Sequence, residues 1–291
     1  MTYATYISQL RSQSGDTKRR VHVDFTGDGS TVAFQLPIGT FPVYEDTDTY
    51  TVAIAAAVKT EGVDYTFDKG TGLIIFTSAP SNGAAITVDC YAVYLSDADW
   101  LLVINNSIKS LGKDFFKEFV DETLTTTAGM LSLSLTSAQP NCIGVYEFWY
   151  RRATTENWVT VETYSNWRHD PDNNKIYISD QFAFPTTGHL LKIRGIKTYT
   201  LGTATTDTID VQDRFLTIVE LGAMERYYKW RYQDVIELVS KESTENSRTP
   251  LQELMMLADR FHRDFEVEKA RLKPQKPSRV IPRYKMGSGR P

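Results

Sequence analysis

Residues 21–95 carry the pattern that most limits how this chain can fold. Apolar and polar residues alternate in two short runs, and the sequence GDGS at residues 27–30 separates the runs. Alternation with a period of two places one side of a strand in a core and the other side in water. A short segment of Gly, Asp and Ser between two such runs predicts a tight turn. The sequence therefore predicts a small antiparallel β-module whose first core residues are Val21, Val23, Phe25, Val32, Phe34 and Leu36.

The rest of the chain alternates between helical and strand-like segments. A second β-rich stretch follows from further alternating runs separated by the turn sequences DPDNN (170–174) and PTTG (185–188). We predict an α+β protein in which two small antiparallel β-modules, of sandwich or barrel type, are joined to a bundle of long helices. The predicted segments are an N-terminal helix and linker (1–20), a first β-module (21–95), a long helix (96–125), a second β-module (126–205), a helical hairpin (206–272) and an extended C-terminal arm (273–291).

The long helix is predicted from apolar residues spaced three and four apart. Ser96 and Asp99 have the spacing of a capping pair, and Asp97 adds negative charge to the first turn. We predict that this helix continues to about Glu122. Its apolar stripe consists of Leu101, Ile104, Ile108, Leu111, Phe115 and Phe119.

Two further helices are predicted near the C-terminus. The first begins after Thr208 and ends near Ser240; the second has Thr249 as its N-cap and Pro250 at its first position. A short polar link between them indicates an antiparallel hairpin. The stripe of the second helix consists of Leu251, Leu254, Ala258, Phe261 and Phe265.

Aromatic and basic residues are interleaved in the sequence ERYYKWRY at residues 225–232. Such a segment could bind nucleic acid by stacking and charge. Alternatively, Tyr228, Trp230 and Tyr232 pack against the partner helix of the hairpin or against a neighbouring subunit. We favour packing over nucleic-acid binding.

The last segment, residues 273–291, contains six basic residues, no acidic residue and three internal prolines. Proline forbids a continuous helix, so we predict an extended arm that is disordered in the free chain. Three roles are open for it: a solvated tail, phosphate binding, or docking on a partner with ordering on binding. We favour docking, because prolines keep the arm extended and lower the entropy that is lost on binding.

Several kinds of chemistry find no support in the sequence. His22, His169, His189 and His262 lack metal-ligand spacing, and the glycine pairs in the turns do not continue as phosphate-binding loops. No apolar run is long enough for a membrane span, and no cleavable signal pattern is present. Cys90 and Cys142 are expected to be buried, which favours assembly in a reducing compartment. The net charge of −4 neither favours nor excludes a nucleic-acid partner. We expect no cofactor and no enzyme activity.

Four segments resemble proteins of tailed bacteriophages. The sequence SDADWLLVINNSIKSLGKDFFKEFVDETLTTTAGMLSLSL (96–135) and the following VYEFWYRRATTENWVTVETYSNW (145–167) resemble head-to-tail adaptor, or head completion, proteins. VDFTGDGSTVAFQLP (23–37) and GVDYTFDKGTGLIIFTSAPSNGAAITV (62–88) resemble a β-module of phage tail-fibre and virion proteins. The order of β-module, helix, β-module, helical hairpin and basic arm gives this resemblance most of its weight.

The resemblance implies a structural virion protein of the neck or tail, assembled in the host cytoplasm. Such adaptors form a ring, commonly of twelve subunits, between the portal protein and a tail or nozzle protein, and tail fibres are a further candidate partner. Genomic DNA would pass through the channel without specific binding, and no membrane is involved. Portal docking would fall on the arm, at Lys273, Lys276, Arg279, Val280, Ile281, Arg283, Tyr284, Lys285 and Arg290. Ring packing would fall on helices 97–122 and 209–240, at Leu101, Ile108, Phe115, Phe119, Tyr228, Trp230 and Tyr232.

Two other functions remain open from the sequence. The first β-module alone would suit a tail-fibre or baseplate protein, which is usually a trimer. Trp149, Trp158 and Trp167, expected on exposed hairpins, would suit a carbohydrate-binding β-protein.

Overall fold

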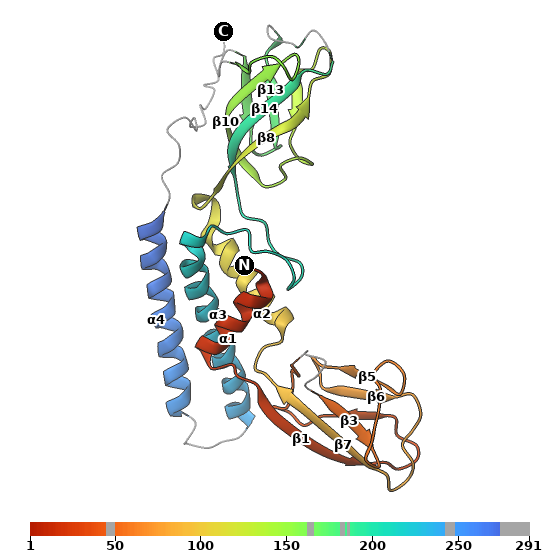
Figure 1. Cartoon of the computed structure of the whole chain (residues 1–291). Coiled ribbons are helices and arrows are strands. Elements are labelled where there is room, and N and C mark those ends of the chain that lie inside the picture. Colours follow the sequence, from red (N-terminus) through yellow and green to blue (C-terminus); the bar gives the residue numbers. More distant parts are fainter. Residues whose placement is uncertain (45–49, 162–165, 181–183, 185–186, 242–247, 274–291) are drawn as a thin grey trace, which may run out of the picture. The chain divides into compact units, whose positions relative to one another are not determined.

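The computed structural model describes all residues except 45–49, 162–165, 181–183, 185–186, 242–247 and 274–291 (Figure 1). The chain divides into two compact units, which are described separately below. The first unit comprises Met1–Ser107, Gly202–Ile209 and Gly222–Phe261, and the second comprises Ile108–Leu201, Asp210–Leu221 and His262–Pro291. The predicted α+β architecture with antiparallel β-modules is confirmed.

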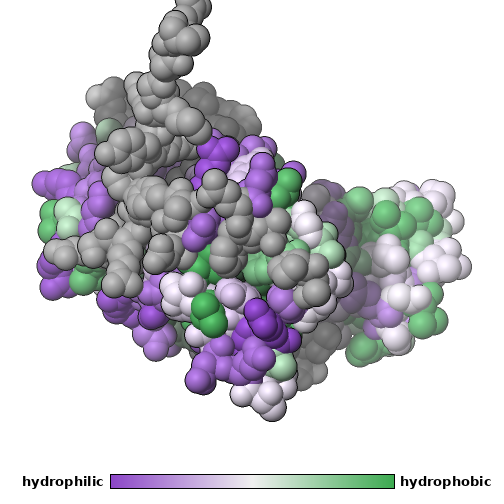
Figure 2. Space-filling view, turned by 90° about the horizontal axis from the view of Figure 1, so that it is seen from above, coloured by the Kyte–Doolittle hydropathy of each residue, from purple (hydrophilic) through white to green (hydrophobic). Residues whose placement is uncertain are grey.

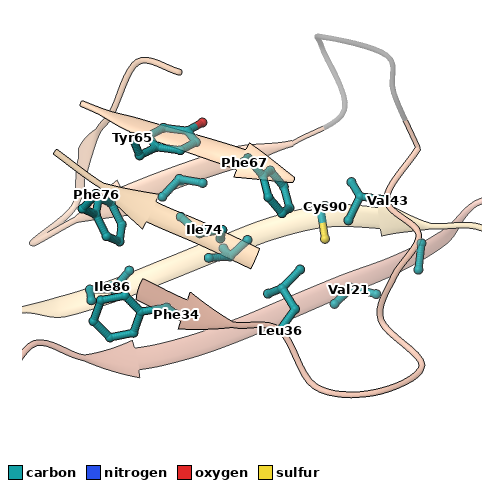
Figure 3. Packing of buried hydrophobic residues seen from close by; sticks show 13 residues of the cluster. Val21, Phe34, Leu36, Val43, Tyr65, Phe67, Ile74, Phe76, Ile86 and Cys90 are labelled. Carbon is teal, nitrogen blue, oxygen red and sulfur yellow. The ribbon is translucent and has the colours of Figure 1, made fainter. Parts of the chain in front are cut away.

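The first β-module consists of two antiparallel sheets with the strand orders β1-β7-β3-β4 and β2-β6-β5. Alternation is clearest in β7, where every second side chain is buried. The inward-facing residues of both sheets form one core, in which Leu36, Ile74 and Ile86 are almost fully buried (Figure 3). The strands are β1 (Arg19–Thr26), β2 (Ala33–Gln35), β3 (Thr51–Ile54), β4 (Ala57–Val58), β5 (Tyr65–Asp68), β6 (Leu73–Phe76) and β7 (Ala85–Ala92).

The turn between β3 and β4 contains two residues, Ala55 and Ala56, with positive φ angles of 47° and 64°. Two consecutive positive φ angles define the type I′ hairpin turn, for which Asn-Gly is the preferred sequence. We expect the double variant Ala55→Asn/Ala56→Gly to raise the free energy of unfolding by about 1 kcal/mol, because Gly has no Cβ and Asn tolerates a positive φ better than Ala. Urea unfolding would measure this change. As a control, Ala57→Gly in the adjacent strand should destabilise the protein, and equal effects of the two variants would contradict the turn assignment.

Four helices occur in the described chain: α1 (Tyr3–Ser14), α2 (Asp97–Leu111), α3 (Asp213–Lys241) and α4 (Arg248–Leu272). The predicted cap of α2 is present, since the Asp99 backbone N–H donates to Ser96 Oγ at 3.1 Å and Ser96 donates back to the Asp99 carboxylate at 2.6 Å. Leu254, Ala258 and Phe265 of the predicted stripe of α4 are buried. Tyr228 on α3 stacks on Phe261 of α4 at 5.5 Å between ring centroids, as the hairpin prediction requires.

The prediction of one helix over residues 96–125 is wrong after Leu111. Gly112 has φ 70°, a short 3₁₀ turn covers Gly112–Asp114, and β8 spans Lys117–Thr125. Leu111, Phe115 and Phe119 are four residues apart, a spacing that suits both a helix and a strand. The flanking residues decide, because Glu118 and Val120 are exposed on either side of buried Phe119, which is a period of two.

The second β-module therefore begins at Lys117 rather than at residue 126. Its two antiparallel sheets have the strand orders β11-β10-β14-β8 and β12-β13-β9. Phe119, Phe148, Trp167 and Ile193 belong to its core. Besides β8, the strands are β9 (Ser132–Ser134), β10 (Cys142–Arg151), β11 (Val159–Thr160), β12 (Trp167–Asp170), β13 (Lys175–Ile178) and β14 (Leu190–Lys197).

Candidate functional site

A buried charged cluster in the first unit joins α1 to the segment between β7 and α2. The Asp16 carboxylate, 1 % exposed, lies 2.7 Å from Arg11 Nη1 and accepts hydrogen bonds from Trp100 Nε1 at 2.8 Å and from the Tyr94 backbone N–H at 2.5 Å. The second Nη of Arg11 donates to the Leu95 carbonyl at 2.7 Å and to Asp97 at 2.8 Å. These bonds hold the first β-module to the helices of the same unit.

Helix α3 continues this cluster within the first unit. The Trp100 ring stacks on Tyr227 at 5.1 Å with an interplanar angle of 14°, and the Tyr94 hydroxyl donates to Asp234 at 2.6 Å. Burial and the adjacent Asp234 raise the pKa of Tyr94. The charged groups of Arg11, Asp16 and Asp97 face one another and hold structural elements together.

The sequence did not point to Arg11 or Asp16 as a pair. Residues 14–20 have the composition of an ordinary polar link. Arg11 lies on a helix that is predicted from its apolar residues alone, so nothing in the sequence marks Arg11 as buried. Only the close approach of α1 to the start of α2 reveals the pair. A single polar residue after a helix C-cap glycine, Gly15 with φ 72°, gives no signal of burial.

In the second unit the nucleophile Cys142 lies near the base His169, at 3.8 Å between Sγ and Nε2. Burial raises the pKa of the Cys142 thiol to about 11 and lowers the pKa of His169. A nucleophilic cysteine needs the opposite shift. Within the described ranges no group of three or more His, Cys, Asp or Glu side chains could hold a metal ion.

Both cysteines should react slowly with alkylating agents. Burial raises the pKa of Cys90, like that of Cys142, to about 11 from 9.0, so both thiols stay protonated at pH 8. We expect iodoacetamide labelling of the folded protein to be roughly 100-fold slower than in urea, because only the thiolate reacts. Mass spectrometry of the time course would show this, and similar rates in both conditions would contradict the burial.

A groove of about 430 Å³ in the second unit lies between the end of α2 and the segment after β14. Ile108, Tyr199 and Leu201 form its apolar part, and Lys109, Asn141 and Thr198 form its polar part. Its lining includes no carboxylate, imidazole or thiol. The groove therefore lacks the acid–base pairs that hydrolytic chemistry requires.

The structure places most of the predicted ring-packing residues inside the chain. Ile108, Phe115, Phe119 and Tyr228 are each at most 8 % exposed. Phe119 lies on β8 in the core of the second β-module instead of on a helix, and Phe115 packs edge-to-face on Phe215 at 5.1 Å. These four side chains are therefore engaged within one copy. Leu101, Trp230 and Tyr232 keep partial exposure, and their contact with another subunit stays a prediction.

Exposed apolar residues that the sequence did not single out lie on the helices of the first unit. Leu102 on α2, Ile236 on α3, and Met255 and Met256 on α4 are 48 %, 39 %, 50 % and 70 % exposed. They lie outside the inward-facing apolar stripes, so the helical periodicity does not predict where they lie. On the face of the molecule in Figure 2, hydrophobic residues occur in small groups among hydrophilic ones.

Several aromatic rings and charged groups of the segment ERYYKWRY make contacts within the chain. Tyr227 and Tyr228 are buried, and the guanidinium carbon of Arg231 lies 5.1 Å from the ring centroid of Tyr94. Lys229 pairs with Glu225 at 2.5 Å. These contacts support the packing interpretation for the two tyrosines.

The basic arm lies almost wholly outside the described residues. Lys273 is described, and its Nζ is 2.9 Å from Asp114 Oδ2 in the second unit. The other residues of the predicted docking set fall in 274–291, which the structure does not describe: Lys276, Arg279, Val280, Ile281, Arg283, Tyr284, Lys285 and Arg290.

The three tryptophans of the second β-module do not share one environment. The expectation of an exposed Trp167 is wrong: it is 4 % exposed, packs against Phe148, and donates from Nε1 to the Val161 carbonyl. Trp149 and Trp158 are half-buried. Lys192 Nζ lies 5.5 Å and 5.6 Å from their ring centroids, and the Arg151 guanidinium carbon lies 4.3 Å from that of Trp158. Cations thus occupy ring faces on which a sugar would stack.

No family model matches this sequence, and no curated protein matches it. Among the described residues, none of the helices combines the length and the apolar character needed to cross a lipid bilayer.

Proposed function

We propose that this chain is a non-enzymatic structural subunit of a tailed-phage virion, and that copies of it form an adaptor ring between the portal and the tail. The resemblance of residues 96–135 and 145–167 to head-to-tail adaptors motivates the proposal. The ring would surround the path of the genome without binding DNA specifically. Portal protein, a tail or nozzle protein and tail fibres are the proposed partners.

The observation that carries the proposal is the exposure of apolar side chains on three helices of the first unit. Leu102, Ile236 and Met256 lie outside the intrachain core, although burial of such side chains is favourable by about 1.5–3 kcal/mol each. A closed ring needs two different surfaces on every copy, which contact each other head to tail. Helices that display apolar residues away from their packed stripes are suited to supply such surfaces.

The polar interior also favours a structural role. Arg11 and Asp16 are buried, and they bond each other and neighbouring groups. The thiol of Cys142 is protonated near neutral pH because burial raises its pKa to about 11. These features suit a rigid assembly subunit better than a hydrolase.

Removal of residues 274–291 should leave the fold intact and prevent joining to the portal. We choose this boundary because it keeps the ion pair between Lys273 and Asp114. The expected result is an unchanged melting temperature with at least tenfold weaker portal binding, since an arm that orders on its partner supplies the docking contacts. Co-sedimentation with purified portal would measure binding.

A full-length variant with the arm sequence scrambled controls for charge. It keeps all six basic residues of segment 273–291. Equal portal binding by the scrambled and natural arms would show that charge alone, and not the order of residues, produces the binding. Portal binding by the truncated chain at full strength would refute the docking role.

A tail-fibre or baseplate protein is the second candidate. The two-sheet first β-module favours it, because such a module with its own core can act as a separate attachment unit. Its mass in solution separates the candidates, since fibre proteins form trimers and adaptors form larger rings. A carbohydrate-binding role is less well supported, given the cations on Trp149 and Trp158.

A further inference from the structure

Charge is strongly segregated along this chain. Residues 19–95, which begin with the first residue of β1, contain nine acidic and four basic residues, whereas the arm, 273–291, contains six basic residues and no acidic one. The first β-module is therefore more negative than the chain as a whole, whose net charge is −4. Opposite charge on separate segments favours contact between them, and salt screens such a contact.

Four acidic side chains among the described residues of the first β-module are at least partly accessible. Asp28 and Asp68 are exposed, Asp64 is half-buried, and the carboxyl group of Asp24 is 67 % exposed. Several of them also hold turns: Asp68 Oδ1 accepts from the Gly70 N–H at 3.0 Å, and Asp64 Oδ2 accepts from the Thr60 N–H at 2.9 Å. Hydrogen bonds from Thr71 lower the pKa of Asp68, so its charge persists into mildly acidic solution.

Of these acids, Asp68 lies on the outer face of the sheet β2-β6-β5 beside the exposed apolar residue Ile75, and Asp64 directly precedes β5, whereas Asp24 belongs to β1 in the other sheet. Ile74 and Phe76 point into the core between the sheets (Figure 3), and Ile75 between them is 42 % exposed on the opposite face. Its neighbours in register, Ala33 and Thr66, are small. Asp68 lies one row away on the same face, paired with Leu73. An extended segment with apolar residues between cations would match this pattern.

The arm has that sequence. Arg279 precedes Val280 and Ile281, and Arg283 and Lys285 follow them. We propose that, in the free protein, the basic arm of one copy docks on the acidic outer face of sheet β2-β6-β5 of a second copy. Prolines at 277 and 282 favour an extended arm and reduce the entropy lost on docking. This contact goes beyond portal docking and competes with it for the same arm.

Two full-length variants separate the two sides of the contact. Asp64→Asn/Asp68→Asn removes charge from the face but keeps side-chain oxygens that accept the turn hydrogen bonds. Arg279→Gln/Arg283→Gln/Lys285→Gln neutralises the arm. In 50 mM NaCl, sedimentation should show self-association of the natural protein that is weakened about tenfold in each variant, since exposed ion pairs contribute modestly and add up. In 500 mM NaCl this difference should vanish.

Mixing the two variants is the decisive step. Each variant has one intact side, so an equimolar mixture should associate more strongly than either variant alone. Asp170→Asn/Asp172→Asn in the second β-module is a matched control, because Asp170 also holds a turn, at 3.0 Å from the Asp172 N–H. This variant should leave association unchanged, because it does not alter the sheet β2-β6-β5. Ile75→Thr should weaken association without changing the melting temperature.

Three results would overturn the proposal. Natural protein that remains monomeric in 50 mM NaCl shows no contact between copies. Variants that associate like the natural protein place the contact elsewhere. A mixture that fails to recover association shows that the arm and this face are not each other's partners. Portal binding is measured separately, and the Asp64→Asn/Asp68→Asn variant should retain it because its arm is intact.

Discussion

Replacing Asp16 with alanine is expected to lower the free energy of unfolding by about 3–5 kcal/mol, because it leaves the guanidinium of Arg11 buried with half of its charge partners. Arg11 is 8 % exposed and Asp16 is 3 % exposed. The substitution also removes the acceptor for Trp100 Nε1 and for the Tyr94 N–H. Urea unfolding followed by circular dichroism would measure the loss.

Asp97→Asn is the matched control for this prediction. Asp97 bonds the same guanidinium at 2.8 Å, but its side chain is 29 % exposed, so we expect a loss of only about 1 kcal/mol. Arg11→Met in the Asp16→Ala background should recover part of the stability, because no buried charge is then left unpaired. If Asp16→Ala and Asp97→Asn cost the same, the cluster does not hold the unit together as described.

Gly202→Ala is expected to cost about 2–4 kcal/mol, because the new methyl group overpacks a filled site. A Cβ at this position would lie 2.4 Å from Cε2 of Tyr3, which is fully buried. The Tyr3 ring has little freedom to move, since its hydroxyl donates to Asn105 Oδ1 at 2.9 Å and accepts from the Gly202 N–H at 3.0 Å. Thermal unfolding would show the effect as a lower melting temperature.

Gly70→Ala controls for the loss of a glycine. A Cβ there would meet only Asp68 Oδ1, at 3.4 Å, so little change is expected. Tyr3→Leu should relieve part of the clash, which makes the double variant Tyr3→Leu/Gly202→Ala more stable than the sum of the single effects. Additive effects would indicate that Gly202 does not approach Tyr3.

Period-two patterns predicted the β-modules, because alternation depends only on local sequence, but the expectation that Val32 lies in the core is wrong, since it is 38 % exposed. Ser96 and Asp99 likewise formed their cap because both partners lie in one helical turn. The segment after Leu111 was misassigned, since residues four apart fit a helix and a strand equally. The φ of 70° at Gly112 ends the helix there. The presence of a glycine in the sequence does not by itself predict a positive φ.

Contacts between residues that are far apart in the sequence could not be predicted from local patterns. Asp16 meets Trp100 across 84 positions of sequence, and no periodicity links them. Trp167 is buried because β12 packs its ring on Phe148 of β10, although its sequence neighbours are polar. Met256 is exposed because it lies off the inward stripe of α4, and only the packed helix shows that.

We propose that copies of this chain form a closed ring on the portal. Cryo-electron microscopy of the purified protein mixed with portal tests it most directly. We predict class averages in which a cyclic ring of more than three copies sits on the portal, and in which truncation before Pro274 removes the ring. Trimers, or portal particles without added density at saturating protein, would contradict the account.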